Sequence, residues 1–375
     1  MKKVLVISSA PLISKQQKYF AYSPYEKEMQ LWAKYTDEIY FCCPIWQEDR
    51  GILNSEVIFK IHRIIPLKEF DIQSFSSVTK AIFYSVINFW IILKAIKNAN
   101  HIHLRCPGNM TLIACFAQIF YPKKIKTAKY AGNWDPNSKQ PVTYKLQKWI
   151  LSNTFLTRNM QVLVYGQWKD QSKNIKSFFT ATYKENEIPQ NEIPQNVTFK
   201  EQIKMLFVGT LSSGKQPLYA LQIILELKKK GFPVVFELYG EGNERAHLQN
   251  FIEKHALEEF VKLKGNQPKD KIEKAYQEHH FLILPSKSEG WPKVVAEAMF
   301  WGCLPIATKI SCVPYMLDNG NRGILITGNL QEDVFQIEQL ITRPLVYIEK
   351  INEGKIWSRE FTLDKFESEI KNLIQ

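Results

Sequence analysis

Short apolar runs alternate with amphipathic segments along most of the chain, and this alternation predicts its secondary structure. In the first half, apolar runs predict strands at residues 3–8, 38–43, 57–65, 101–105 and 126–131. Apolar residues at helical spacing predict helices at 26–35 and 109–120, and a long helical stretch that ends at residue 97. This order is typical of a doubly wound α/β domain with a parallel sheet.

The second half repeats the alternation. Strands are predicted at 205–208, 234–239, 261–263, 281–284 and 304–308. Helices are predicted at 217–230 and 268–278, and another begins at Pro292. Because the carboxyl ends of parallel strands meet at one edge of a sheet, we expect the loops that follow them to converge on one ligand. A chain of 375 residues has room for two such α/β domains.

The segment between the two halves reads NEIPQNEIPQ over residues 186–195, a tandem pentapeptide with two prolines and no apolar periodicity. Such a composition is typical of an extended linker. We therefore predict an N-terminal domain at 1–185, a linker at 186–197 and a C-terminal domain at 198–357.

Residues 281–308, FLILPSKSEGWPKVVAEAMFWGCLPIAT, form the most informative stretch of the chain. Its first four residues predict a buried strand. Pro292 suits the first position of a helix, because its missing N–H would have no partner there. Gly302 predicts the end of that helix, and another strand follows. The loop between strand and helix therefore lies where open α/β sheets bind ligands.

Two carboxylates flank the amino end of this predicted helix. Glu289 precedes the helix, and Glu297 lies five residues beyond Pro292, about 7.5 Å along the axis. The free N–H groups of the first turn would bind phosphate, and the carboxylates would bind a sugar ring and a ribose diol. A nucleotide sugar offers these three parts in that order. The pair alone is a weak indicator, because a glutamate on a helix is most often solvated.

Glycine-containing loops follow other strands of the second half. The loop from Gly209 to Lys215 lets backbone approach a ligand, and its lysine can supply a cation to a diphosphate. Gly240-Glu241-Gly242 resembles a dinucleotide-binding fingerprint but has Arg245 in place of the third glycine, so it is a weak indicator of a nicotinamide cofactor.

The strand, the Glu-Gly-Trp-Pro turn, the Ala-Glu-Ala-Met helix and the Gly-x-x-Pro exit together resemble the Glu-x7-Glu signature of retaining GT-B glycosyltransferases, family 4 in particular. The resemblance covers most of residues 203–330. It implies two Rossmann-like domains that face each other across a cleft. The donor nucleotide would bind the C-terminal domain and the acceptor the N-terminal one, and the final helix, 358–375, would cross back onto the first domain.

The resemblance also implies roles for single residues. Lys215 matches the phosphate-binding lysine, Glu289 the sugar-contacting glutamate and Glu297 the ribose-binding glutamate. Lys215 and Glu289 are therefore the catalytic candidates. The predicted donor-binding set is Gly209, Thr210, Lys215, Gly240, Gly265, Asn266, Glu289, Gly290, Trp291, Lys293 and Glu297.

The chain departs from the family pattern at several positions. Thr210 stands where the family often has an arginine that helps to neutralise the diphosphate, and Ser8-Ser9-Ala10-Pro11 replaces a glycine-rich loop. Gly132-Asn133 lies where a histidine is common. These differences bear on donor identity and catalytic efficiency more than on the fold.

Three residues of the first half are candidates for binding the acceptor. Arg105 follows one predicted strand and could bind a phosphate or carboxylate, while Asn133 and Asp135 follow another and could bind sugar hydroxyls. The alternatives are a surface ion pair for Arg105 and turn formation before Pro136 for Asp135.

Charge is divided unevenly between the two halves. Residues 1–185 carry 26 Lys and Arg against 12 Asp and Glu, a net charge of +14, and residues 186–375 carry 23 against 25, a net charge of −2. The first half therefore favours an anionic partner, either a membrane surface or a lipid-pyrophosphate acceptor. Nucleic acid is disfavoured, because the lysines are dispersed and no recognition motif is present. A basic face that only aids solubility is the alternative.

The six cysteines show no metal-ligand spacing and no disulfide framework, which argues against a zinc site and favours a reducing cytoplasm. No Asp-x-Asp metal motif is present, so we expect no metal, and we expect no cofactor besides the donor substrate. No segment reaches the roughly 20 apolar residues that span a bilayer. The nearest approach, residues 81–96, is expected to be a buried helix. We expect a cytoplasmic protein, with the inner face of the cytoplasmic membrane as the alternative location.

These inferences predict a retaining, metal-independent hexosyltransferase that moves a sugar from a nucleoside diphosphate sugar to an acceptor hydroxyl in surface polysaccharide or glycolipid synthesis. One alternative is a sugar-nucleotide 2-epimerase of the same fold, which would need a cluster of acid–base side chains that the seven histidines do not evidently form. The other is a catalytically degenerate GT-B protein that only binds a partner.

Overall fold

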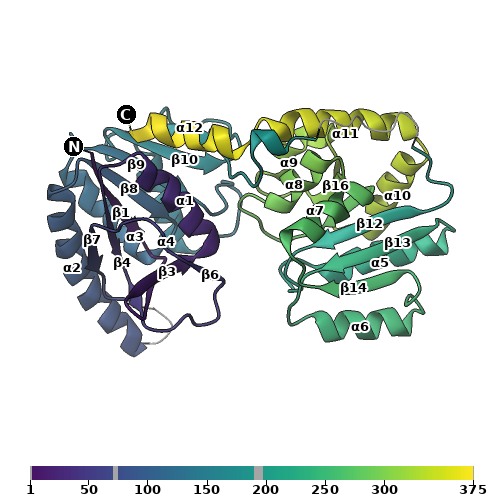
Figure 1. Ribbon diagram of the computed structural model, residues 1–375, viewed down its shortest axis with the longest axis horizontal. Helices are drawn as coiled ribbons and strands as arrows, with labels where there is room; N and C mark the ends of the chain where they lie inside the picture. Colours follow the sequence, from purple (N-terminus) through teal and green to yellow (C-terminus); the bar gives the residue numbers. More distant parts are fainter. Residues whose placement is uncertain (1, 71–74, 190–196, 375) are drawn as a thin grey trace. The chain divides into compact units, whose positions relative to one another are not determined.

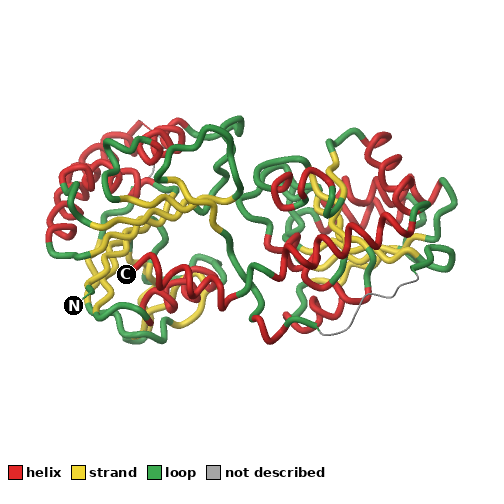
Figure 2. Tube along the Cα trace, turned by 90° about the horizontal axis from the view of Figure 1, so that it is seen from above, coloured by secondary structure: helices red, strands yellow, loops and turns green. Residues whose placement is uncertain are grey.

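The computed structural model describes residues 2–70, 75–189 and 197–374, and the chain divides into two compact units (Figure 1). The first unit comprises Met1–Phe178 and Glu367–Gln375, and the second comprises Phe179–Phe366. In each unit, helices lie on both sides of the strands (Figure 2).

The first unit contains a seven-stranded sheet in the order β11-β10-β9-β8-β1-β4-β7, and every pairing within it is parallel. The order reverses at β1, because β4 and β7 extend the sheet on one side and β8 to β11 on the other. The elements are β1 (Lys3–Ser8), α1 (Ser23–Lys34), β4 (Glu38–Cys43), β7 (Arg63–Pro66), α2 (Phe75–Lys97), β8 (His101–Cys106), α3 (Asn109–Ala117), the 3-10 turn η1 (Gln118–Phe120), β9 (Ile125–Tyr130), α4 (Val142–Ser152), β10 (Met160–Tyr165) and β11 (Ile175–Phe178).

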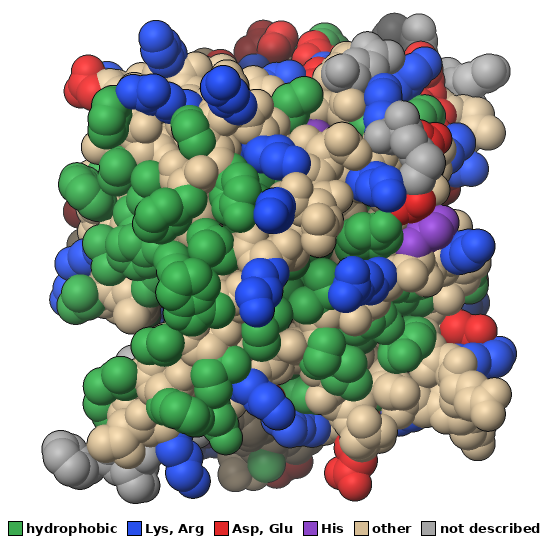
Figure 3. All heavy atoms as spheres, turned by 90° about the vertical axis from the view of Figure 1, so that its left-hand side faces the viewer, with side chains coloured by type: hydrophobic (Ala, Val, Ile, Leu, Met, Phe, Trp, Pro, Cys, Tyr) green, Lys and Arg blue, Asp and Glu red, His purple; other side chains and the backbone are tan. Residues whose placement is uncertain are grey.

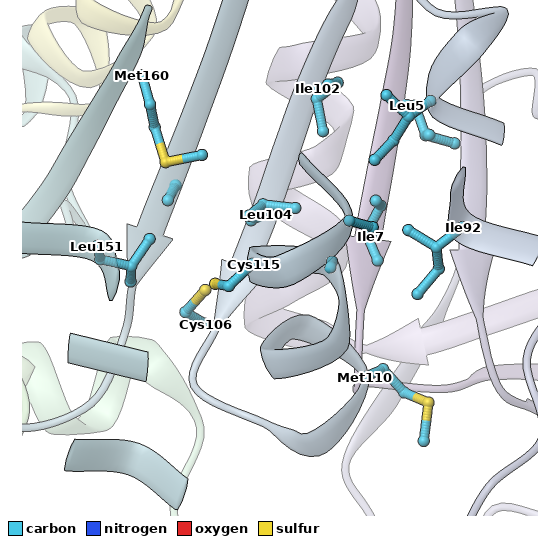
Figure 4. Close-up of a cluster of buried hydrophobic side chains, with 14 of the residues drawn as sticks. Leu5, Ile7, Ile92, Ile102, Leu104, Cys106, Met110, Cys115, Leu151 and Met160 are labelled. Atoms are coloured by element: carbon cyan, nitrogen blue, oxygen red, sulfur yellow. The ribbon is translucent and has the colours of Figure 1, made fainter. Parts of the chain in front are cut away.

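One hydrophobic core lies between this sheet and the helices α2, α3 and α4 (Figure 4). Leu5 of β1 and Leu104 of β8 contribute from the sheet, and Ile92, Cys115 and Leu151 contribute from the three helices. All five side chains have no solvent exposure. The apolar runs and helical stripes read from the sequence are therefore the residues that join these two layers.

A second, four-stranded sheet follows β1 and was not predicted. Its order is β5-β2-β3-β6, with β2 (Leu12–Lys15), β3 (Lys18–Tyr22), β5 (Ile45–Trp46) and β6 (Asn54–Glu56). Gln16 and Gln17 join β2 to β3, and both have positive φ values, 48° and 62°. Two-residue hairpins with positive φ usually carry Asn-Gly or Asp-Gly, so the Gln-Gln pair gave no signal in the sequence.

The helix α2 corrects a prediction. Among the described residues, one helix, Val78–Lys97, is long and apolar enough to cross a membrane by length and composition, and only 28% of its apolar window is buried. It is therefore neither too short nor the buried helix that was expected at 81–96. Its inner side chain Ile92 is fully buried against the sheet, whereas Ile82 and Trp90 are 63% and 56% exposed.

The second unit contains a six-stranded parallel sheet in the order β14-β13-β12-β15-β16-β17. Its elements are the 3-10 turn η2 (Glu185–Glu187), β12 (Ile203–Val208), α5 (Pro217–Lys229), β13 (Val234–Tyr239), α6 (Arg245–Lys254), β14 (Val261–Gly265), α7 (Lys269–Glu278), β15 (Phe281–Leu284), α8 (Lys293–Trp301), β16 (Leu304–Thr308), α9 (Val313–Met316), the 3-10 turn η3 (Asp318–Gly320), β17 (Ile324–Ile326), α10 (Leu330–Ile341) and α11 (Pro344–Arg359).

The boundary between the units lies before the predicted linker. Most of that linker, residues 190–196, lies outside the described residues. Its described start is attached to the second unit, because Glu185 N–H donates to the Asp364 carboxylate at 2.8 Å and Lys269 pairs with Glu187 at 3.2 Å. The units divide at Phe178 rather than at residue 185.

The carboxyl-terminal helix α12 (Leu363–Ile374) lies within the segment 358–375 that the resemblance expected to cross back, and its residues from Glu367 onward belong to the first unit. Glu367 accepts hydrogen bonds from Lys34 and Tyr35, and Glu369 pairs with Lys176 at 2.6 Å. Charged contacts thus hold the last two turns of the chain on the first unit.

Candidate active site

The loops that carry most of the predicted donor residues leave the carboxyl ends of β12 and β15. Strand order in the second sheet reverses between these two neighbours, because β13 and β14 extend from β12 while β16 and β17 extend from β15. Loops that diverge at such a reversal leave a crevice in which α/β proteins bind ligands. The N–H of Lys287 donates to the C=O of Gly214 at 2.9 Å, so the two loops also touch at the site.

Lys215 and Glu289 face each other across this switch point. The Lys215 Nζ lies 2.5 Å from the Glu289 Oε1, and the two side chains are 32% and 9% exposed. Lys215 stands just before α5, and Glu289 stands just before α8. The structure therefore brings together the two residues that the resemblance named as catalytic, 74 positions apart in the chain.

The glycines of the β12 and β13 loops allow these loops to pack backbone against backbone. A Cβ on Gly240 would lie 1.9 Å from the carbonyl oxygen of Gly209, and one on Gly242 would lie 2.2 Å from that of Leu211. Gly209 N–H donates to Tyr239 C=O at 2.9 Å. Gly240 and Gly242 thus hold the loop that carries Lys215 in place. This packing explains the two glycines without a bound dinucleotide.

The loop after β14 packs against the loop after β13. Gly265 has a φ of 68° and its carbonyl accepts the Gly240 N–H at 2.9 Å, so the β13 and β14 loops are also joined. Asn266 and Thr210 are exposed, and Gly240 is buried. Gly240 and Gly265 therefore shape the loops rather than offer side chains to a ligand.

The helix α8 begins one residue later than the motif predicted. Pro292 occupies the N-cap position and Lys293 the first helical one, so the amide groups of the first turn open toward the Glu289 loop. Gly302 ends the helix in a left-handed conformation with φ of 87°. The Sγ of Cys312 donates to the Gly290 carbonyl at 2.9 Å and holds the loop against the next segment.

Trp291 was predicted to bind the donor, but its indole belongs to a buried aromatic cluster. The ring is 8% exposed, stacks on Trp357 of α11 with centroids 6.0 Å apart, and meets Phe361 edge-on at 5.8 Å. Its side chain therefore anchors the loop on α11, and only its backbone remains next to the amino end of α8.

Glu297 also has partners that the sequence did not predict. Its Oε1 accepts the Thr182 hydroxyl at 2.7 Å, and its Oε2 accepts the Tyr276 hydroxyl at 3.3 Å. Burial raises the pKa of Glu297, and these hydrogen bonds offset part of that effect. The carboxylate is thus held between α7 and the segment that enters the second unit, and two of its roughly four acceptor positions are used.

The predicted acceptor residues have hydrogen-bond partners within the first unit, and their contact with an acceptor stays a prediction. Arg105 donates to Glu28 at 3.0 Å, and Lys129 pairs with the same carboxylate at 2.9 Å. Burial alone would raise the pKa of Glu28, but the two cations lower it to about 2. The Asn133 side chain accepts the Asp135 N–H at 2.9 Å, and the Asp135 side chain accepts the Asn137 N–H at 2.8 Å, so these residues form turns.

A polar pocket of about 240 Å³ lies elsewhere at the carboxyl edge of the first sheet. It follows β1, β4, β7 and β8, at the reversal of strand order in this unit. The residues that line it include Ser9, Glu69, Gly108, Asn109 and Tyr144. Ser9 belongs to the segment that replaces the family's glycine-rich loop, and Gly108 and Asn109 belong to the loop that follows Arg105, but the sequence named none of the five as a binding residue.

Residues 189–350 match the family model described as Glycosyl transferases group 1. In sequence, the chain is similar to an uncharacterized glycosyltransferase of Haemophilus influenzae, with 28% identity over 209 residues that cover 53% of this chain and 58% of that protein. The alignments with the two relatives that follow it span 37% and 33% of their lengths. The match to the family model lies within the second unit.

Fold similarity extends over nearly the whole chain. The structure of Anabaena HepE in complex with UDP has a TM-score of 0.68 at 12% identity, with 99% of each chain covered. The apo form of the lipopolysaccharide outer core galactosyltransferase WaaB has a TM-score of 0.67 at 14% identity, again with 99% of each chain covered. The chain has the GT-B fold. The predicted fold class, α/β with two Rossmann-like units, is confirmed.

Proposed function

We propose that this GT-B chain is a retaining, metal-independent hexosyltransferase that uses a nucleoside diphosphate sugar in the synthesis of a cytoplasmically assembled surface polysaccharide or glycolipid. The Lys215–Glu289 pair at the switch point between β12 and β15 carries the proposal. The match of residues 189–350 to Glycosyl transferases group 1 supports it, as do a fold neighbour in complex with UDP and another named as a lipopolysaccharide galactosyltransferase.

Glycosyl transfer requires positive charge near the diphosphate leaving group. As the bond between the anomeric carbon and the phosphate oxygen breaks, negative charge develops on that oxygen, and a bond forms from the acceptor hydroxyl oxygen to the same carbon. The leaving phosphate oxygen takes the acceptor proton. Lys215 and the first amides of α8 would stabilise the leaving group from fixed positions, without the need for a metal ion.

Glu289 would act on the sugar. A diphosphate competes with Glu289 for the Lys215 ammonium, and the carboxylate is then released to accept hydrogen bonds from sugar hydroxyls. The two acceptor positions that remain on Glu297 would take the ribose diol beside Thr182 and Tyr276. The acceptor would enter the polar pocket lined by Glu69 and Asn109 in the first unit.

The positions of the histidines favour transfer over epimerisation. The loops 209–216, 240–244, 265–268 and 285–292 contain no histidine. The His280 Nδ1 accepts the Lys204 N–H at 3.0 Å, which places this ring at the amino end of β12, the edge opposite the candidate site. An epimerase would require acid–base groups beside the sugar.

The test has two stages. Thermal unfolding with UDP-, GDP- and ADP-sugars identifies the donor, because a bound ligand raises the Tm. With that donor, free nucleoside diphosphate should appear only when an acceptor is added, and NMR should show that the anomeric configuration is retained. Activity should survive EDTA. Interconversion of the donor without an acceptor would support the epimerase, and an inverted product would contradict the mechanism.

A further inference from the structure

The solvent-facing side of the helices α2, α3 and α4 in the first unit carries many apolar side chains, although solvent-facing helix surfaces are usually polar. Twelve of the 18 exposed large hydrophobic side chains among the described residues lie between Val78 and Phe155. Scattered apolar residues are normal on a surface, but a contiguous patch marks an interaction site. Figure 3 shows hydrophobic side chains gathered on the side of the molecule that α2 borders, with lysine and arginine side chains among and around them. We call this surface the α2–α4 face; the exposed apolar side chains on its helices are Val78, Ile82, Phe83, Val86 and Trp90 of α2, Phe116 of α3, Phe120 of η1, and Val142, Leu146 and Trp149 of α4.

A groove opens on this face between α2 and the end of α3. Its volume is about 640 Å³, and Ser85 is the only polar residue among the eight that line it. The Phe89 and Phe120 rings meet edge-on there with centroids 6.0 Å apart. Such a groove offers almost no hydrogen bonds to a polar ligand, but it suits a hydrocarbon chain.

The charge of the same stretch is almost entirely positive. Between Asp71 and Asp170 the sequence has 13 Lys and Arg residues and a single acidic one, Asp135. Lys94 and Lys97 are exposed in the last turn of α2, beyond the exposed rings of that helix. Aromatic side chains beside lysines are typical of surfaces that lie at the interface of an anionic membrane. A second copy of the same face would bring like charges together.

The helix α2 lies along such a surface and does not cross it. Its inner residues Ile92 and Ile96 are fully buried in the core of the first unit. Asn88 is also buried and exchanges two hydrogen bonds with the Lys68 backbone, at 2.9 and 2.8 Å. Removing this helix from the fold would expose the core, so only its outer side is available to lipid.

We propose that the α2–α4 face docks the protein on the surface of an anionic lipid bilayer, with the aromatic side chains and the groove in the acyl region and the lysines at the headgroups. The docking itself does not require the proposed transferase activity. Where that activity is granted, the geometry favours an acceptor carried by the bilayer: α3 begins at Asn109 beside the polar pocket and continues through η1 to Phe120 in the groove, a length of about 16 Å.

Vesicle flotation tests the docking with the full chain and without any nucleotide. Vesicles that contain phosphatidylglycerol are compared with vesicles of phosphatidylcholine alone. The patch variant is Ile82→Glu with Trp90→Glu, and the matched control is Ile356→Glu with Phe335→Glu on the second unit. The two pairs have the same exposed fractions, 63% and 56%. A charge variant, Lys94→Glu with Lys97→Glu, tests the headgroup contacts, and unchanged Tm values establish that the variants fold.

The wild type and the control variant should float with anionic vesicles and remain behind with neutral ones, and added salt should weaken binding. The patch and charge variants should bind at least about tenfold more weakly. Failure of the wild type to float, or equal flotation of the patch variant, overturns the proposal. A dimer in solution that the patch variant abolishes, without vesicle binding, would assign the face to a second copy instead. None of these results depends on transferase activity, so they leave the proposed function to its own test.

Discussion

The hydroxyl of Thr182 donates a hydrogen bond of 2.7 Å to the carboxylate of Glu297, 115 residues further along the chain. Thr182 lies in the segment that enters the second unit, and Glu297 lies on α8. Burial raises the pKa of Glu297, and the Thr182 hydroxyl is the first of the groups that oppose this effect. The contact therefore ties the entering segment to the helix whose amino end forms the candidate site.

Thr182→Val should destabilise the protein by about 1–3 kcal/mol at neutral pH, because a buried carboxylate loses a donor. The folded-state pKa of Glu297 already lies above the usual 4.5, and the substitution raises it further. A carboxyl group whose pKa is raised in the folded state stabilises the protein only below its unfolded pKa, and this stabilisation is lost as pH rises. The difference in unfolding free energy between wild type and Thr182→Val should therefore shrink as the pH is lowered toward 4.5. Urea unfolding at both pH values measures this.

Thr180→Val is the matched control, since the buried Thr180 hydroxyl has no hydrogen-bond partner among the described residues. It should leave stability nearly unchanged at both pH values. A loss of stability in Thr182→Val that is the same at both pH values would mean that the Thr182 hydroxyl does not affect the pKa of Glu297.

A buried ion cluster should dominate the acid sensitivity of the first unit. Glu28→Gln leaves Arg105 and Lys129 without their carboxylate and should cost about 3–5 kcal/mol at neutral pH. Because the folded pKa of Glu28 is lowered to about 2, its stabilisation is present above pH 4.5 and is lost as pH falls through 2. The difference in unfolding free energy between the wild type and Glu28→Gln should therefore become smaller as the pH is lowered.

Glu56→Gln removes a carboxylate from an exposed pair with Lys18 and serves as the control. Its effect should be far smaller at every pH, because solvent screens that pair. Equal losses for the two variants would contradict the special role of the buried cluster.

Gly240 should not tolerate a side chain. Gly240→Ala would place a Cβ 1.9 Å from the Gly209 carbonyl at a φ of 141°, so the β12 and β13 loops must separate. We expect a loss of about 2–3 kcal/mol and a loss of nucleotide-dependent thermal stabilisation. Gly214→Ala is the control in the neighbouring loop, because the nearest atom to its Cβ is 3.9 Å away. Loss of binding in both variants would show that loop flexibility, and not the close approach, matters.

The strand and helix of the motif could be predicted because local chemistry fixes them. Phe281–Leu284 is a strand of four buried apolar residues, Pro292 lies at the N-cap of α8, one position before the predicted one, and Gly302 ends the helix in a left-handed conformation. That the Lys215 and Glu289 loops lie at the same edge of the sheet was also expected, because both follow parallel strands, but the ion pair between the two side chains was not predicted.

Long-range packing explains what could not be predicted. Trp291 turns into a cluster with Trp357, and Glu297 meets Thr182, and neither partner is marked by spacing in the sequence. The Asp135 carboxylate accepts the Asn137 N–H in a local turn, which is the alternative that its position before Pro136 suggested. The exposed apolar side of α2 was not predicted. Sequence periodicity shows that a helix has apolar residues on a side, but it does not show whether another part of the protein covers that side.

Lys215 should control the affinity for the nucleotide. Lys215→Ala should remove most of the rise in Tm that a nucleoside diphosphate causes and lower kcat by about 10²–10³-fold, because a fixed cation at the leaving group is lost. Lys229→Ala, at the other end of α5 in an exposed pair with Glu226, should change neither quantity. Equal behaviour of the two variants would contradict a phosphate contact at Lys215.

Hydrogen exchange with and without the donor nucleotide tests the central claim most directly, since it reports the backbone amides of both switch-point loops in the unmodified chain. Saturating nucleoside diphosphate should slow exchange in residues 209–216 and in the Glu289 loop through the first turn of α8, with little change in the first unit. Unchanged exchange in both loops, or protection confined to other segments, would contradict a diphosphate bound between Lys215 and the amino end of α8.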